Sequence, residues 1–126
     1  MTLSSVRRGG AYACAAFAVA IMASAQAAGD AGRGEALYRD CQACHSIGEN
    51  GVGPMHRGVF GRGAGMVEGY HYSPALKNAK IIWTEENLDK WLTDPQSLIP
   101  GTKMFYAVAD PQDRADLIAF LKERAR

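Results

Sequence analysis

The segment Cys41-Gln42-Ala43-Cys44-His45 brings two cysteines and a histidine close together in the chain. On a helical turn, residues i, i+3 and i+4 lie on one face of the backbone. Two thiols in this arrangement can bond the two vinyl groups on one side of a porphyrin, while the adjacent imidazole reaches the iron. The C-x-x-C-H spacing is typical of haem c attachment. The motif therefore predicts a domain that folds around one haem, held covalently through Cys41 and Cys44.

The beginning of the chain has the pattern of a secretory signal. Arg7 and Arg8 precede an uncharged apolar run from Ala11 to Ala23, and small residues follow it. This order of basic, apolar and small residues is typical of a cleaved signal peptide. We expect residues 1–27 to be removed and residues 28–126 to form the haem domain in the periplasm.

The alternative to cleavage is an uncleaved membrane anchor. The apolar run is shorter than the roughly 20 residues that span a bilayer, so cleavage is favoured and no stable membrane insertion is expected afterwards. Loss of Arg7 and Arg8 with the signal leaves 12 basic residues against 13 acidic ones in the mature chain. A net charge near −1, with no basic stripe, gives no indication of a nucleic-acid partner.

Two other uses of a C-x-x-C pair are a zinc site and a redox dithiol. A zinc site lacks further cysteines once Cys14 is removed with the signal, and His56 and His71 are poorly spaced to replace them. A thioredoxin-like dithiol requires a βαβ context that the sequence does not contain. Both alternatives are weaker than haem attachment.

Helix-start signals and helical spacing of apolar residues recur along the mature chain, and no segment alternates long enough to predict a strand. Glycine is dense from Gly48 to Gly69, which favours a loop that passes close to another group. The expected fold is all-α and single-domain, with three to five short helices wrapped around the haem. The predicted helices are Asp30–Asp40, Ser73 to Lys77 or Asn78, Thr84 to just before Pro95, and Pro111–Arg124.

Three methionines remain in the mature chain as candidates for a second axial ligand of the iron. Met55 is close to His45 in sequence and belongs more naturally on the same side of the pocket, and Met66 stands among glycines with no supporting frame. Met104 follows the constrained segment Pro100-Gly101 just after a helix. A methionine is more often core filling than ligand. The location of Met104 nevertheless favours it as the second axial ligand.

From Gly34 to Leu121 the chain resembles the class I cytochromes c, in particular the mitochondrial-like and short bacterial members. The motifs occur in the family's order and at compatible spacing, over nearly the whole mature chain. They are Cys41-Gln42-Ala43-Cys44-His45, Gly51-Val52-Gly53-Pro54, Gly58-Val59-Phe60-Gly61-Arg62, Ile99-Pro100-Gly101-Thr102-Lys103-Met104 and Arg114-Ala115-Asp116-Leu117-Ile118-Ala119-Phe120-Leu121.

The resemblance implies that His45 and Met104 are the axial ligands, and that the Pro54 carbonyl accepts a hydrogen bond from the other ring nitrogen of His45. It also implies a crossing of the first and last helices, with Gly34 and Leu37 against Leu117 and Phe120. Arg62, Tyr72 and Trp83 match the family positions that hold a haem propionate. For Tyr72 and Trp83, spacing alone favours ordinary packing instead.

The chain departs from the family pattern at several positions. His56 stands where an apolar leucine is usual, and we expect a solvated loop residue there rather than a polar group near the haem. Trp91 stands where a tyrosine often touches the methionine sulfur, and Leu76 replaces a polar residue of the same hydrogen-bond network. Tyr106 replaces a phenylalanine at the haem edge.

Mitochondrial-like members surround this haem edge with lysines, but the corresponding basic ring is sparse here. Lys103, Arg39 and Lys90 remain, whereas Asp40, Gln96 and Ser97 occupy neighbouring family positions.

These features together predict a periplasmic one-electron carrier, expected to be monomeric, that exchanges electrons with redox proteins such as a membrane or periplasmic reductase and oxidase. Two stable axial ligands would leave no open position for catalysis, so an enzyme is not expected. The alternative function is a haem enzyme, or a gas or peroxide sensor, with a labile sixth ligand. A module that serves one dedicated enzyme is a second alternative.

Overall fold

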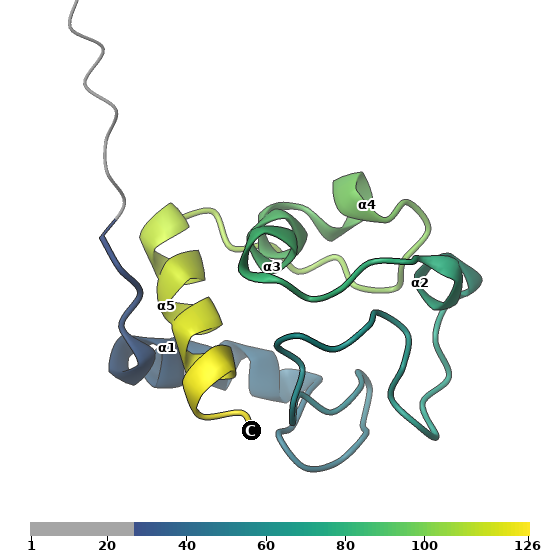
Figure 1. Ribbon diagram of the computed structural model, residues 1–126, viewed down its shortest axis with the longest axis horizontal. Coiled ribbons are helices and arrows are strands. Elements are labelled where there is room, and N and C mark those ends of the chain that lie inside the picture. The colour runs from purple at the N-terminus through teal and green to yellow at the C-terminus, as the bar shows by residue number, and fades with distance from the viewer. Residues whose placement is uncertain (1–26) are drawn as a thin grey trace, which may run out of the picture.

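The computed structural model describes residues 27–126, so the predicted signal peptide lies almost wholly outside the described residues. The described residues form five α-helices and one 3-10 helix (Figure 1). They include no sheet, and their one strand-like pairing is an isolated bridge between Gly63 and Ile82. The all-α prediction is confirmed. The helices are α1 (Ala31–Leu37), η1 (Tyr38–Ala43), α2 (Pro74–Asn78), α3 (Glu85–Thr93), α4 (Pro95–Leu98) and α5 (Pro111–Glu123).

The first helix differs from the predicted continuous segment Asp30–Asp40. The α-helical winding ends at Leu37, and the chain continues as the 3-10 helix η1 as far as Ala43. A 3-10 helix is tighter than an α-helix and is common as a short extension at a helix end. Helical winding therefore extends farther than predicted and carries the first cysteine of the C-x-x-C-H motif.

Side-chain caps fix the start of four helices at the positions expected from the sequence. Each capping oxygen accepts a hydrogen bond from a backbone N–H of the first turn, which has no partner within the helix. In α3, for example, the Thr84 hydroxyl accepts from the Asn87 N–H at 3.2 Å. The four caps are Asp30, Ser73, Thr84 and Asp110.

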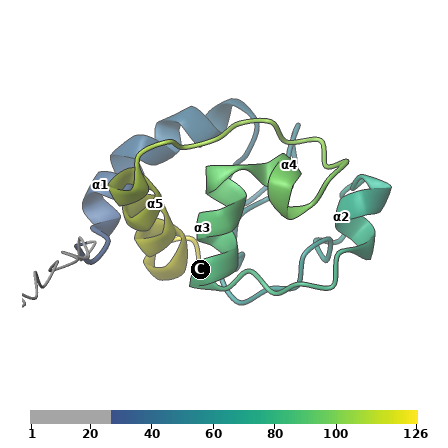
Figure 2. The ribbon, with the colours of Figure 1, turned by 90° about the horizontal axis from the view of Figure 1, so that it is seen from above.

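Helices α1 and α5 cross beside each other at one end of the molecule (Figures 1 and 2). The crossing is close because Gly34 has no side chain: a Cβ at this position would lie 2.0 Å from the Asp116 carbonyl oxygen. The Tyr38 ring continues the contact and lies 4.8 Å, centroid to centroid, from the Phe120 ring. The predicted crossing of the first and last helices is present, with Gly34 and Phe120 in it.

Helix α4 was not predicted, because the chain was expected to leave helical structure before Pro95. The Asp94 carboxylate caps it by accepting from the Gln96 N–H at 3.0 Å and the Ser97 N–H at 3.3 Å. Proline is well tolerated in a first helical turn, where its missing N–H has no helical partner to lose. Asp94-Pro95 thus repeats the signal that was recognised at Ser73-Pro74.

Seen from above, α3 lies between the α1–α5 pair and α2 (Figure 2). The glycine-rich segment 48–69 runs below α3 in Figure 1, beside α1 and the end of α5, and encloses the interior from that side. Among the described residues, no helix is long and apolar enough to cross a membrane.

Candidate functional site

One cavity of about 770 Å³ lies between the helices and the glycine-rich loop. Its apolar wall includes Leu88 and Leu92 of α3 and Leu117 and Leu121 of α5. A largely apolar cavity with a few polar groups is the usual form of a cofactor site. All eight residues predicted to form the site line this cavity: Cys41, Cys44, His45, Pro54, Arg62, Tyr72, Trp83 and Met104.

The two cysteines of the motif lie at the end of η1 and form no disulfide with each other. The Cys41 carbonyl oxygen accepts hydrogen bonds from the Cys44 N–H at 3.1 Å and the His45 N–H at 2.8 Å. This single turn holds both sulfur atoms and the imidazole at one wall of the cavity. Before haem attachment, burial, with a smaller contribution from the Asp40 charge, raises the pKa of the Cys41 thiol to about 11.

The His45 ring is oriented by backbone groups of the following loop. Its Nδ1–H donates to the Pro54 carbonyl oxygen at 2.7 Å, the contact that the resemblance implies. A Cβ at Gly53 would lie 2.3 Å from Cε1 of the same ring, so the backbone approaches as closely as glycine permits. Burial lowers the pKa of His45 and favours the neutral ring. With Nδ1 protonated, Nε2 keeps its lone pair for a metal.

His56 is not the solvated loop residue that we expected. Its ring stacks on the His45 ring with centroids 4.0 Å apart and planes 20° apart. Its Nδ1 is 3.0 Å from the hydroxyl of Tyr38. Burial, with smaller contributions from the charges of His45 and Arg62, lowers the pKa of His56 to about 3. This contact could not be predicted from a local motif, because it joins η1 to a loop residue 18 positions later.

Arg62 shows that the cavity fits a group with an acidic substituent. Its two terminal nitrogens donate to backbone carbonyl oxygens of Arg57 and Met55, at 2.7 and 3.1 Å. Its Nε is buried and has no hydrogen-bond partner among the described residues. A buried donor of this kind normally has a partner, and a carboxylate such as a haem propionate would supply one.

Two tryptophans and a tyrosine form another part of the wall. The rings of Trp83 and Trp91 meet edge to face at 5.1 Å, and both are buried. The Tyr72 hydroxyl accepts from the Val67 N–H at 3.1 Å. Trp91 and Leu76, the two departures expected near the methionine, both line the cavity.

Met104 reaches the cavity from a loop that is held by Gln96 of α4. The Gln96 amide nitrogen donates to the carbonyl oxygens of Thr102 and Met104, at 2.8 and 3.0 Å. Its amide oxygen accepts from the Gly101 N–H at 3.3 Å. Gln96 was expected only as a position without a lysine, and its contacts with this loop were not predicted. Met55 and Met66, the other two methionines, do not line the cavity.

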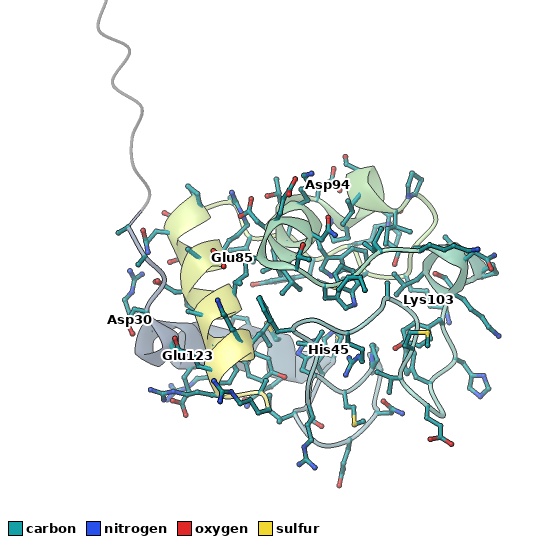
Figure 3. All side chains as sticks on the ribbon, viewed as in Figure 1. Asp30, His45, Glu85, Asp94, Lys103 and Glu123 are labelled. Atoms are coloured by element: carbon teal, nitrogen blue, oxygen red, sulfur yellow. The ribbon has the colours of Figure 1, made fainter. Side chains whose placement is uncertain are left out.

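Figure 3 shows the His45 ring in the interior, between the lower loop and the helices, and Lys103 near α2. The Lys103 Nζ donates to the His71 carbonyl oxygen at 3.0 Å. Lys103, Arg39 and Asp40 also line the cavity, so with Arg62 three basic groups and one acidic group belong to its wall.

Comparisons with known proteins agree with this geometry. The cytochrome c family profile matches residues 31–125. Cytochrome c2 of Rhodomicrobium vannielii is 48% identical over 103 residues, which cover 79% of this chain and 82% of that protein. Cytochrome c2 of Blastochloris viridis is 47% identical over 111 residues, which cover 85% of this chain and 87% of that protein. The structure of cytochrome cH from Methylobacterium extorquens superposes with a TM-score of 0.74 at 45% identity, and covers 76% of this chain and all of that one.

The fold and the cavity thus define a small haem protein with a C-x-x-C-H attachment site. The chain belongs to the cytochrome c family, and its similarity to the cytochromes c2 places it among the class I members. It carries haem c bound covalently through Cys41 and Cys44. It is a cytochrome c2-like electron carrier that exchanges electrons with redox protein partners, and it is not an enzyme.

Proposed function

We propose that this chain is a periplasmic one-electron carrier whose haem iron is bound by His45 and Met104. The observation that carries the proposal is that both side chains line the same cavity as the two attachment cysteines. His45 comes from the turn after η1 and Met104 from the loop after α4, so the two ligands approach from different segments of the fold.

The haem supplies a single iron that takes up and releases one electron. The residues around it would set the equilibrium between its two oxidation states. A histidine and a methionine together stabilise reduced iron better than two nitrogen ligands. The apolar wall excludes water and disfavours the additional charge of oxidised iron.

The ligand supports found in the structure favour a site that changes little during electron transfer. The His45 ring is fixed through Pro54 and Gly53, and the carbonyl oxygen of Met104 is fixed through Gln96. Ligands that stay in place in both oxidation states leave little to rearrange. Arg62, Tyr72 and Trp83 would contact the haem propionates, and the unpartnered Nε of Arg62 supports this assignment.

We further propose that residues 1–27 are a cleaved export signal and that residues 28–126 act in the periplasm as a monomer. The basic start and the apolar run that follows support export. The partners would be a membrane or periplasmic reductase and oxidase.

The test is the optical spectrum of the reduced haem protein before and after addition of carbon monoxide. A closed His45/Met104 site gives an unchanged spectrum, and the oxidised protein shows a sulfur-to-iron charge-transfer band. The variant Met104→Ala should lose that band, bind carbon monoxide and have a lower reduction potential. Met66→Ala is the matched control, because this methionine is 70% exposed and does not line the cavity. Rapid carbon monoxide binding by the unmodified protein would refute the closed site and favour a sensor or enzyme with a labile ligand.

A further inference from the structure

Tyr38 and His56 form a polar pair directly behind His45. The Tyr38 hydroxyl and His56 Nδ1 are 3.0 Å apart, and the His56 ring lies flat against the His45 ring at 4.0 Å. Neither Tyr38 nor His56 is among the eight residues predicted to hold the cofactor. The family pattern expected an apolar residue at position 56, which could fill the same space but could not exchange a hydrogen bond.

The pair is anchored where η1 packs on α5. Tyr38 is only 2% exposed, and its ring packs 4.8 Å from Phe120 of α5. A buried hydroxyl needs a hydrogen-bond partner, and breaking the pair would leave a buried polar group unsatisfied. The position of the His56 ring is therefore determined by the crossing of α1 and α5, and not by the loop alone.

The contacts of His45 leave one freedom that this pair can restrict. The hydrogen bond to Pro54 fixes the position of Nδ1, and the Gly53 backbone limits how far the ring can shift. The hydrogen bond restrains rotation about the axis that joins the imidazole to a metal at one edge of the ring only, so a contact on the ring face would add a second restraint. A flat partner at 4.0 Å with an angle of 20° between the planes opposes that rotation.

We propose that Tyr38 and His56 are positioning residues that fix the rotational orientation of the His45 imidazole over the haem. The inference rests on the proposed ligation of iron by His45 and adds to it the residues that set the plane of the ligand. Neither residue would contact the iron. Tyr38 would hold the His56 ring through their hydrogen bond, and His56 would hold the His45 ring through the stacking contact.

Proton NMR of the oxidised holoprotein tests this directly, because the spread and order of the haem methyl resonances depend on the orientation of the axial imidazole plane. His56→Leu removes the flat ring and should alter that pattern. Tyr38→Phe keeps the buried ring and removes only the hydroxyl, so it should shift the pattern in the same direction by a smaller amount. In a protein that already carries His56→Leu, Tyr38→Phe should produce no further shift.

His71→Leu is the matched control, since His71 is exposed and outside the cavity wall, and it should leave every methyl resonance in place. A lower melting temperature of His56→Leu with unchanged methyl resonances would mean simple packing and overturn the inference. The inference would also be overturned if Tyr38→Phe shifted the haem methyl resonances equally in the unmodified protein and in the His56→Leu variant. The unmodified protein tests ligation separately: if it lacks the low-spin spectrum of a bound imidazole, the proposed function fails, whatever the variants do.

Discussion

At the scale of single residues, Gly53 leaves the least room beside the proposed iron ligand. A Cβ at this position would come within 2.3 Å of Cε1 and 2.6 Å of Nδ1 of His45. Because the backbone is also tied to this ring through the next residue, Pro54, the clash cannot be relieved by moving the ring alone.

Gly53→Ala should therefore displace the ligand ring and lower the free energy of unfolding by about 1–3 kcal/mol, the usual cost of overpacking. Chemical denaturation of the holoprotein gives the stability, and the oxidised spectrum reports ligation. Gly51→Ala is the control, because its Cβ would meet only the Cys44 carbonyl oxygen at an ordinary 3.5 Å. Equal behaviour of the two variants would show that the close approach at Gly53 is not limiting.

Six of the eight predicted site residues belong to short motifs of the family pattern, whereas Tyr72 and Trp83 were predicted from the resemblance alone. The C-x-x-C-H segment is the clearest case. The roles of Tyr38 and His56 could not be predicted in this way, because their contact joins residues whose proximity depends on how the loop folds back onto η1. A departure from the family pattern indicated that position 56 was unusual, and only the structure gave its partner.

At the scale of elements, Asp116 joins α5 to the start of α1. It is fully buried and accepts from the Asp30 N–H at 2.7 Å and the Gln112 side-chain amide at 3.0 Å. Arg33 approaches its other oxygen at 3.1 Å. The same arginine also pairs with Asp113, which lies farther out on α5.

Asp116→Ala should lower the free energy of unfolding by about 2–3 kcal/mol, because it leaves the Asp30 N–H without its acceptor and opens a buried space. Asp113→Ala removes only a partly exposed ion pair with the same arginine and should change stability by no more than about 1 kcal/mol. Urea unfolding of both holoproteins measures the difference. A loss for Asp113→Ala as large as that for Asp116→Ala would contradict the assignment of the buried carboxylate as the main link.

Helix α4 shows a second limit of sequence analysis. The four long or well-capped helices were predicted within a few residues, because their caps and apolar spacing are local. Helix α4 spans only Pro95–Leu98, too few residues for helical periodicity to appear, and its one local signal, Asp94-Pro95, was interpreted as the end of the preceding helix. Its function is also non-local: Gln96 contacts the carbonyl oxygens of residues six and eight positions later.

Gln96→Ala should loosen the loop that carries Met104 without removing the ligand itself. The reduced variant should bind carbon monoxide measurably, though more slowly than Met104→Ala, because Met104 must dissociate first. Ser97→Ala is the control in the same helix, since its hydroxyl contacts only the Asp94 carboxylate. If Gln96→Ala excludes carbon monoxide as well as the unmodified protein does, the amide contacts do not hold the ligand in place.

At the scale of the whole molecule, the surface around the cavity mouth is apolar and weakly charged. Phe105, Val52 and Tyr106 line the cavity and are 78%, 76% and 47% exposed. The charged residues of the cavity wall are Arg39, Arg62, Lys103 and Asp40. The haem propionates would offset Arg62, and Asp40, whose carboxylate accepts from the Tyr106 hydroxyl at 3.4 Å, offsets one of the other two basic groups. Long-range attraction of a charged partner depends on a field that this balance keeps small.

Electron exchange should therefore depend weakly on salt. With ferricyanide as the anionic oxidant, we expect the bimolecular rate to change by less than about twofold between ~10 mM and ~150 mM ionic strength, while the Debye length falls from about 30 to about 8 Å. Stopped-flow mixing of the reduced holoprotein measures this rate.

Lys103→Glu reverses one charge at the cavity wall and should lower the rate at low salt by roughly threefold, with recovery as salt is added. A steep fall in the rate of the unmodified protein with added salt would mean that a positive field outside the cavity mouth steers the encounter. In that case the apolar residues at the mouth would act only after the partners have met.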